Sequence, residues 1–226
     1  MRLNKFIAEQ TGVSRREADD LIAAGKVSVG ERVAKLGERF TDGDKVFLDG
    51  VLIVPKTAFT YIMLNKPVGY VSSRKAQDNA PTLYELLPDE YKLLKTVGRL
   101  DKESSGLILL TDDGDFTLQM THPKFEKVKV YEATLDQPLA PLHQQMLADF
   151  GIELPDGLSK LGLAEIGEGR KKWQVTMHEG RNRQIRRSFG ALGYTVVALH
   201  RTDFGKYHLS NLESGKIRKL DFSSDV

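Results

Sequence analysis

An aspartate lies between a glycine-containing turn and an apolar run near the middle of the chain. The stretch reads Gly98-Arg99-Leu100-Asp101, and Lys102-Glu103-Ser104-Ser105 leads from it into Gly106-Leu107-Ile108-Leu109-Leu110. Glycine permits a tight backbone, and a buried strand would hold Asp101 in place better than a mobile loop. A carboxylate placed in this way can act as a nucleophile or a base, although an aspartate in a solvated turn gives the same pattern.

A second stretch, Lys127-Val128-Lys129-Val130-Tyr131-Glu132-Ala133, alternates in the manner of a strand. Val128 and Val130 then point to one face, and Lys129 and Tyr131 to the other. Tyr131 could stack on a nucleic-acid base, an interaction worth about 1–3 kcal/mol. A half-buried tyrosine that only packs the sheet is the competing interpretation.

The third stretch, residues 169–187, concentrates seven cations against the single acid Glu179. Gly180 supplies a turn, and Asn182 is expected to cap a helix whose apolar side carries Ile185, Phe189 and Leu192. Arginines at the start of that helix could meet phosphate, whereas a solvated helix face is the alternative. The cations are Arg170, Lys171, Lys172, Arg181, Arg183, Arg186 and Arg187.

Composition limits the classes of protein that can be considered. The chain has 226 residues, 40% of them hydrophobic and 28% charged, which is ordinary for a globular protein. It contains no cysteine, which excludes disulfides, thiolate nucleophiles and cysteine-ligated zinc. Charges in the first ten residues interrupt any signal-like apolar run, and no stretch approaches transmembrane length, so a cytoplasmic protein without membrane contact is expected.

The elements that must position these residues begin with a compact helical pair. Leu3, Phe6 and Ile7 have helical spacing, and Gly12 ends the pattern. Ser14 followed by Glu17 predicts a capping box at the start of a second helix. Strand-like pieces at 26–29 and 45–48 follow, and residues 49–60 contain Gly50 and Pro55, which indicates a linker.

The remainder of the chain predicts a second, larger domain. Strands are expected at 61–64, 107–111, 128–135, 173–178 and 195–200, alternating irregularly with a few helices. That mixture indicates an α+β fold with a largely antiparallel mixed sheet. The predicted domains are therefore residues 1–59, a small helix-helix-strand module, and residues 60–226, which would carry the chemistry.

Four motifs in order resemble the RsuA-type family of ribosomal RNA pseudouridine synthases, over nearly the whole chain. The opening segment, residues 1–30, resembles the S4 RNA-binding domain, named after a ribosomal protein, that commonly precedes the catalytic domain of this family. NKPVGYVSS (65–73), GRLDKESSGLILLTDDG (98–114) and HEGRNRQIRR (178–187) resemble the three catalytic-domain motifs. The resemblance implies an S4-type module followed by a pseudouridine synthase domain.

The resemblance also implies roles for individual residues. Asp101 corresponds to the catalytic aspartate, Arg99 to an arginine that helps to displace the target base, and Tyr131 to the tyrosine that stacks on the uracil. Ile185 matches an apolar contact, and Arg186 matches the basic partner of the carboxylate, which would lower the pKa of Asp101 if the two are close. Arg183 and Arg187 lie in the same motif, so the sequence leaves open which arginine pairs with Asp101. Further RNA contacts are expected from Lys5, Arg15, Arg16, Lys26, Arg181, Arg183 and Arg187.

The implied reaction breaks the bond between ribose C1′ and the base nitrogen and rejoins the base through carbon, without oxidation, so no cofactor and no metal are expected. Asp101 either attacks C1′ or removes the C2′ proton, and the sequence leaves both routes open. A non-catalytic RNA-binding or ribosome-assembly factor is the alternative. A metal-dependent hydrolase is disfavoured because none of the five histidines forms a metal-binding pair.

The expected partner is ribosomal RNA or a pre-ribosomal particle, bound by a monomer. RNRQIRR resembles members that act on the large subunit, whereas the opening segment and the length suit members that act on the small subunit. Large-subunit RNA is slightly preferred on this basis.

Overall fold

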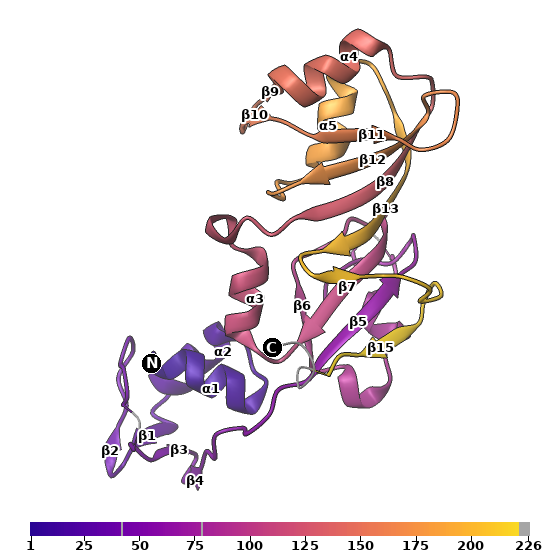
Figure 1. The fold of residues 1–226 in the computed structure, drawn as a ribbon. Coiled ribbons are helices and arrows are strands. Elements are labelled where there is room, and N and C mark those ends of the chain that lie inside the picture. Colours follow the sequence, from indigo (N-terminus) through magenta and orange to yellow (C-terminus); the bar gives the residue numbers. More distant parts are fainter. Residues whose placement is uncertain (42, 78, 222–226) are drawn as a thin grey trace. The chain divides into compact units, whose positions relative to one another are not determined.

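The structure, a computed structural model, describes residues 1–41, 43–77 and 79–221 (Figure 1). These residues form two compact units. The first consists of residues up to 60 together with 112–114, and the second of residues 61–111 and those from 115 onward. None of the described helices has the length and apolarity that a membrane-spanning helix requires.

The first unit combines two short helices with a small antiparallel sheet. Helix α1 (Leu3–Thr11) ends at Gly12, whose φ of 83° is the left-handed conformation that glycine favours. The predicted capping box at the start of α2 (Arg15–Ala23) is confirmed, because Ser14 Oγ accepts from the Glu17 amide and the Glu17 carboxylate accepts from the Ser14 amide. The sheet order is β2 (Arg32–Val33), β1 (Val27–Val29), β3 (Val46–Leu48), β4 (Val51–Leu52).

The linker expected at residues 49–60 is wrong in its first part. Asp49 and Gly50 both have positive φ, 48° and 80°, and they form a tight turn between β3 and β4. Two consecutive positive φ values suit the right-handed twist of a hairpin. The glycine therefore marks a hairpin of this sheet at a position where the sequence suggested an unstructured connection.

The second unit is built on a nine-stranded sheet, as the predicted α+β fold requires. Its central order is β11-β12-β8-β13-β7-β5-β15, with β14 paired to β13 and β6 paired to β7. Every pair in it is antiparallel except β13 with β7. A separate hairpin joins β9 and β10. The strands are β5 (Tyr61–Lys66), β6 (Lys95–Val97), β7 (Ser105–Thr111), β8 (Lys129–Leu135), β9 (Ile152–Leu154), β10 (Gly157–Ser159), β11 (Gly162–Glu165), β12 (Lys172–Met177), β13 (Val196–Phe204), β14 (Tyr207–His208) and β15 (Ile217–Lys219).

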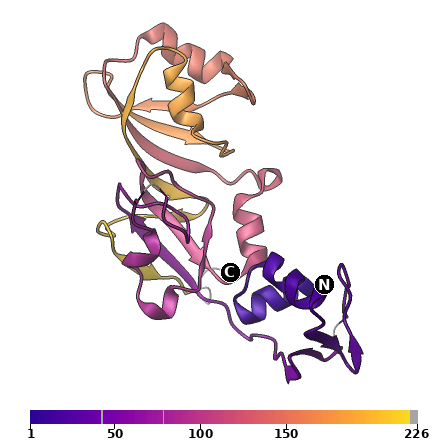
Figure 2. The same ribbon diagram turned by 180° about the vertical axis from the view of Figure 1, so that it is seen from behind.

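Helical segments connect these strands. In both views α4 and α5 lie together beside β11 and β12 (Figures 1 and 2). The α-helices after residue 60 are α3 (Gly114–Thr121), α4 (Pro141–Gln145) and α5 (Gln184–Gly190). The other helical turns are η1 (Leu83–Leu86), η2 (Asp89–Tyr91), η3 (Pro123–Phe125) and the π-helical η4 (Met146–Phe150).

Strand β7 is buried on both faces. Ile108 and Leu110 pack into one apolar cluster, whereas Leu107 and Leu109 pack into another on the opposite side of the sheet. A strand covered on both sides shows a continuous apolar run instead of alternation, which explains residues 107–110. This burial fixes the strand that begins directly after the Asp101 loop.

Gly106 allows β7 and β13 to approach each other in parallel. Its φ is 106°, and a Cβ atom at this position would lie 2.2 Å from the carbonyl oxygen and 2.6 Å from the amide nitrogen of Arg201. Both contacts are with backbone atoms, which a rotamer change cannot relieve. Glycine is therefore required where the only parallel pair of the described sheet forms.

We expect Gly106→Ala to lower the free energy of unfolding by about 2–3 kcal/mol, because the added methyl group must push β13 away from β7. Urea denaturation measures the change. Gly190→Ala is the matched control: Gly190 lies in α5 with ordinary φ and open space around its Cβ position, so alanine there should be neutral or slightly stabilising. Equal stability of the two variants would contradict the close approach.

Candidate active site

A pocket of about 360 Å³ lies in the second unit. Five stretches of the sequence line it: the loop from Gly98 to Ser104, the segment from Met120 to Pro123, strand β8 near Tyr131, the segment from Met177 to Arg186, and strand β13 near Arg201. The volume falls in the range of pockets that bind small ligands. One flipped nucleotide is of this size class.

The pocket brings together most of the residues that the sequence predicted for the site. Asp101 and Arg99 lie on the loop between β6 and β7, and Tyr131 lies on β8. The residues in this set are Arg99, Asp101, Tyr131, Arg181, Arg183, Ile185 and Arg186. The order of the sheet places them together, because β8 and β7 both flank β13.

Hydrogen bonds from residues 66–72 hold the backbone of the loop that carries Asp101. Lys66 Nζ donates to the carbonyl of Ser104 at 2.7 Å, and the Gly69 amide donates to the carbonyl of Lys102 at 2.8 Å. Ser72 Oγ donates to the carbonyl of Leu100 at 2.8 Å and accepts from the Leu100 amide at 3.2 Å. These contacts fix the backbone on both sides of Asp101.

Lys66 is fully buried, and burial lowers its pKa to about 8, while the carboxylates of Asp101 and Glu103 oppose that shift. Its ammonium group also donates to the Pro67 carbonyl at 3.0 Å. A buried charge requires such partners, since desolvation is costly. Sequence reasoning gave Lys66 no role, although the NKP of its motif was the available signal.

Asp101 forms its ion pair with Arg183, not with the predicted Arg186. Arg183 Nη1 lies 3.7 Å from the Asp101 carboxylate and 2.8 Å from that of Glu103. Arg186 donates instead to the carbonyls of Val196 at 2.5 Å and Glu103 at 3.1 Å. Burial and the neighbouring Arg183 lower the pKa of Arg186, whereas the carboxylates of Glu103 and Asp101 raise it. Arg186 therefore binds the backbone of the loop and also interacts electrostatically with Asp101.

The expected cap at Asn182 is wrong. Helix α5 begins at Gln184, so its N-cap is Arg183, which has a left-handed φ of 47° and makes no side-chain cap hydrogen bond. The Gln184 side chain instead accepts from the Arg181 amide at 3.2 Å. A non-glycine residue in this conformation is strained, and here it directs a guanidinium toward the carboxylates of the 98–104 loop.

Tyr131 and Ile185 form an apolar part of the pocket wall. Their exposed fractions are 8% and 4%, and both belong to the main core cluster. The Tyr131 hydroxyl accepts a long hydrogen bond, 3.5 Å, from Arg201 Nη1. The predicted strand at 195–200 continues to Phe204, and this extension carries Arg201 into the pocket wall.

Two predicted RNA-contacting arginines are engaged within the protein. Arg187 pairs with the carboxylate of Asp156 at 2.7 and 3.0 Å, and it does not line the pocket. Arg181 lines the pocket, but its guanidinium donates to the carbonyls of Asp156, Gly157 and Leu158 at 2.8–2.9 Å. These bonds hold the β9–β10 turn.

Two of the four RNA-contacting residues predicted in the first unit line a common depression, and the other two do not. Lys5 and Arg15 line a shallow cationic depression together with Met1, Arg2 and Arg39. Arg16 and Lys26 do not line it, and Lys26 lies 3.9 Å from the Asp49 carboxylate. Sequence reasoning missed Arg2 and Arg39, because a single cation at a chain end or in a loop carries no pattern.

Lys129 is a pocket residue whose role was also missed. It lies on the same face of β8 as Tyr131 and is 9% exposed. Burial first, and then the positive charge of Arg201, lower its pKa from 10.5 to about 8, while Glu179 opposes the shift. The alternation of residues 128–131 had already placed Lys129 on the Tyr131 face, but the sequence gave no sign that this lysine is buried.

The part of the chain that the structure describes contains no group of three or more histidine or carboxylate side chains placed to hold a metal ion. Of the histidines, His122 and His178 line the pocket, whereas His200 Nδ1 lies 2.9 Å from Ser105 Oγ across the β13–β7 pair.

Comparison with known proteins identifies the class to which this fold and pocket belong. Residues 60–191 match the family model for RNA pseudouridylate synthases, and residues 1–46 match the S4 domain. The chain belongs to the RNA pseudouridylate synthase family, with an S4 domain ahead of the catalytic domain. It is therefore a pseudouridine synthase, and the S4 and synthase resemblances drawn from the motifs are confirmed.

Similarity to individual relatives extends along the whole chain. It is 36% identical to the Bacillus subtilis protein named ribosomal large subunit pseudouridine synthase B, covering 97% of this chain and 91% of the relative. It is 37% identical to the Pasteurella multocida protein named ribosomal small subunit pseudouridine synthase A, covering 97% and 96%. A crystal structure of a pseudouridylate synthase matches with a TM-score of 0.71 at 34% identity, over 99% of this chain and 97% of that one.

The buried Lys129 predicts a stability that depends on pH. Its pKa is lowered in the folded state, so the unfolded chain binds more protons between about pH 8 and 10.5. The free energy of unfolding should therefore rise with pH through this window. In Lys129→Met the rise should be smaller, because a lysine with a lowered pKa is gone. Urea denaturation at pH 7.5 and 9.5 measures both slopes, and identical slopes would contradict the burial of this charge.

Proposed function

We propose that this chain converts a specific uridine of ribosomal RNA to pseudouridine, with the Asp101 carboxylate acting on the ribose. The observation that carries the proposal is the position of Asp101: its side chain is 34% exposed, on a loop held from both sides, and it faces a pocket walled by Tyr131 and Ile185. Ribosomal RNA is proposed because relatives at 36–37% identity carry ribosomal names.

The reaction is an isomerisation: the product has the composition of the substrate, although the hydrogen at C5 is exchanged for a proton from solvent. The bond from ribose C1′ to N1 breaks, and its electron pair leaves with the uracil. The base turns, C5 bonds to C1′, the C5 proton is lost, and N1 gains a proton. No oxidant or reductant enters this balance.

Asp101 would act at the ribose in one of two ways. As a nucleophile it attacks C1′ and holds the sugar as an ester until C5 displaces it. As a base it removes the C2′ proton to leave a glycal, and it returns that proton to C2′ when C5 bonds to C1′. Both routes need an ionised carboxylate. Arg183 Nη1, 3.7 Å away, places a positive charge beside the carboxylate.

The target nucleotide must leave its stack to reach Asp101, at a cost of a few kcal/mol. Tyr131 is proposed to stack on the flipped uracil, with Ile185 as an apolar contact beside it. Arg99 is exposed, and its guanidinium has no hydrogen bond or ion pair among the described residues, so it is available to displace the base or bind phosphate. Arg186 is proposed to support Asp101 through the Glu103 carbonyl.

The cationic depression of the S4 domain, with Lys5 and Arg15, is proposed to add affinity for the phosphate backbone. Arg16 and Lys26 are exposed and would contribute as secondary contacts. Large-subunit RNA is the substrate we propose to test first, because residues 181–187 resemble the large-subunit members. The chain is about equally identical to relatives with large-subunit and small-subunit names, so small-subunit RNA must be tested as well.

The test is tritium release from ribosomal RNA labelled at uridine C5. The wild-type chain should release tritium from one subunit's RNA, and Asp101→Asn should release none, since the amide is neither a nucleophile nor a base. RNA affinity should stay within about threefold, because Asp101 adds no attraction to phosphate. Filter binding measures affinity in parallel.

Asp149→Asn is the matched control, since Asp149 is an exposed carboxylate outside the pocket. It should leave tritium release unchanged. Binding by the wild-type chain without release from either subunit's RNA would overturn the proposal in favour of a non-catalytic assembly factor.

The Ser72 contact to the Asp101 loop predicts a positioning effect. Ser72→Ala removes both hydrogen bonds to Leu100 and should lower kcat by about tenfold while KM changes little, because the displaced carboxylate matters only in the transition state. The free energy of unfolding should fall by only about 1 kcal/mol. Ser73→Ala is the control: Ser73 Oγ accepts from the Lys75 amide at 3.2 Å, away from the Asp101 loop, so this variant should retain full activity. A loss confined to KM would contradict a positioning role.

A further inference from the structure

Two buried cations lie together in the pocket wall, and the reaction steps above assign neither a role. Lys129 on β8 is 9% exposed and Arg201 on β13 is 2% exposed. The aromatic ring of Phe204 lies under both, 5.1 Å from Lys129 Nζ and 4.9 Å from the guanidinium carbon of Arg201. The two strands are hydrogen-bonded neighbours, so the pair is held by the sheet itself.

No carboxylate forms an ion pair with either cation among the described residues. Lys129 Nζ donates to the Lys127 carbonyl at 3.1 Å, and Arg201 Nε donates to the Leu107 carbonyl at 2.7 Å. The acid that acts on Lys129, Glu179, is bonded to Arg181 at 3.0 Å and to Gln184.

Arg201 Nη2 is buried without a hydrogen-bond partner within the described part of the chain. Two desolvated positive charges side by side cost free energy unless a negative group joins them. The protein's own side chains do not supply that group, which indicates that a ligand does.

The position of the pair relative to Tyr131 indicates which part of the substrate reaches it. Lys129 and Tyr131 are two residues apart on the same face of β8, and Arg201 Nη1 donates to the Tyr131 hydroxyl. A base stacked on Tyr131 therefore lies beside both cations. The phosphodiester groups of the strand are suited instead to the exposed guanidinium of Arg99 and the half-exposed one of Arg183.

We propose that Lys129 and Arg201 stabilise the uracil anion that leaves C1′, and hold it while it turns; this inference rests on the proposed function. When the bond to C1′ breaks, the electron pair gives the uracil one negative charge, shared by N1, O2 and O4. Fixed cations aimed at a charge that develops only in the transition state accelerate the step without strengthening ground-state binding.

The protonation of Lys129 supports the assignment and adds a pH dependence. With a pKa of about 8, Lys129 is mainly an ammonium ion at pH 7. The charged groups that act on it are Arg201 from β13 and Glu179 from the segment after β12. Above pH 8 the ammonium form is lost, so the rate of the wild-type chain should fall, whereas Lys129→Arg should keep its rate to higher pH.

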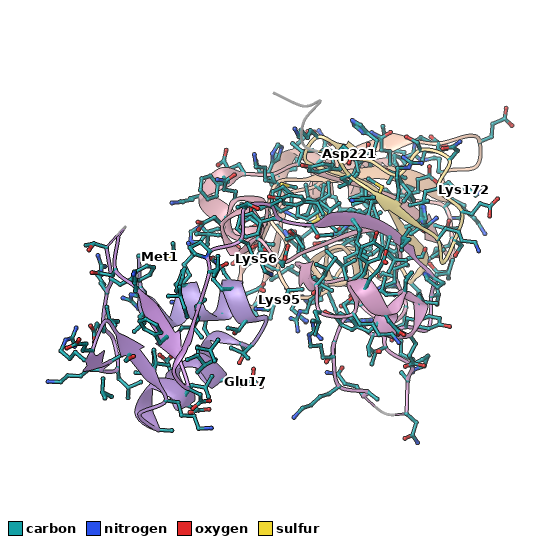
Figure 3. All side chains as sticks on the ribbon, turned by 90° about the horizontal axis from the view of Figure 1, so that it is seen from below. Met1, Glu17, Lys56, Lys95, Lys172 and Asp221 are labelled. Carbon is teal, nitrogen blue, oxygen red and sulfur yellow. The ribbon has the colours of Figure 1, made fainter. Side chains whose placement is uncertain are left out.

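The experiment compares Lys129→Met and Lys129→Arg in the full chain, on the ribosomal RNA that the wild-type chain modifies. Single-turnover rates are measured with saturating protein, and affinity by filter binding at two salt concentrations. We expect Lys129→Met to lose about 100-fold in rate, with affinity within about threefold of wild type. Lys172→Met is the control, because Lys172 is exposed at the periphery of the second unit (Figure 3), and it should keep the wild-type rate.

A substrate with a better leaving group tests the chemical claim directly. Fluorine at C5 withdraws electrons and stabilises the uracil anion, so RNA containing 5-fluorouridine needs less help from the protein. Loss of 5-fluorouridine, followed by nuclease digestion and mass spectrometry, should show a Lys129→Met deficit about tenfold smaller than that with uridine. The melting temperature of Lys129→Met should equal or exceed that of wild type, because a desolvated charge has been removed.

Three outcomes overturn the inference while leaving the proposed function intact. The first is an unchanged single-turnover rate in Lys129→Met, and the second is a loss confined to affinity and its salt dependence, which would assign the pair to phosphate binding. The third is an equal deficit in rate with uridine and with 5-fluorouridine. A lowered melting temperature with equal deficits assigns Lys129 a structural role and also overturns it. Absence of turnover by the wild-type chain instead defeats the proposed function itself.

Discussion

The backbone from Leu100 to Ser104 is held by hydrogen bonds from two other parts of the chain, and the site depends on them. The Lys66 ammonium and the Ser72 hydroxyl bond to this loop from the strand side, and Arg186 bonds to it from α5. Most acceptors are backbone carbonyls, so the geometry does not depend on the identity of the loop side chains. Asp101 can then face the pocket from a backbone that is held in place on both sides.

The same contacts couple the chemistry to the charge balance of the pocket. Lys66 is buried with a lowered pKa, and Asp101 and Glu103 offset part of its desolvation. On β8 and β13, no carboxylate among the described residues forms an ion pair with Lys129 or Arg201, and Glu179 offsets only part of the desolvation of Lys129. The pocket therefore has one side where positive and negative charges are balanced around the carboxylate, and one side with excess positive charge, which is the arrangement that a reaction with an anionic leaving group requires.

The sheet brings these two walls together because β13 lies between β8 and β7. Strand β13 carries Arg201, β8 carries Tyr131 and Lys129, and the Asp101 loop enters β7. Gly106 permits the parallel contact between β7 and β13 at the level of Arg201. One glycine thus affects both the stability of the fold and the distance between the walls of the pocket.

The sequence by itself determined the end of α1 at Gly12, the capping box of α2, the main strands and the motif residues, since capping, alternation and apolar runs are local properties. It placed Tyr131 and Lys129 on one face, and it identified Asp101 through its motif. Tertiary structure decided which arginine pairs with the carboxylate. Arg183 and Arg186 belong to the same short motif, and only the start of α5 at Gln184 places Arg183 before the helix and Arg186 inside it. It also decided the burial of Lys129, since desolvation depends on strands that are distant in the sequence, and no local pattern records their contact.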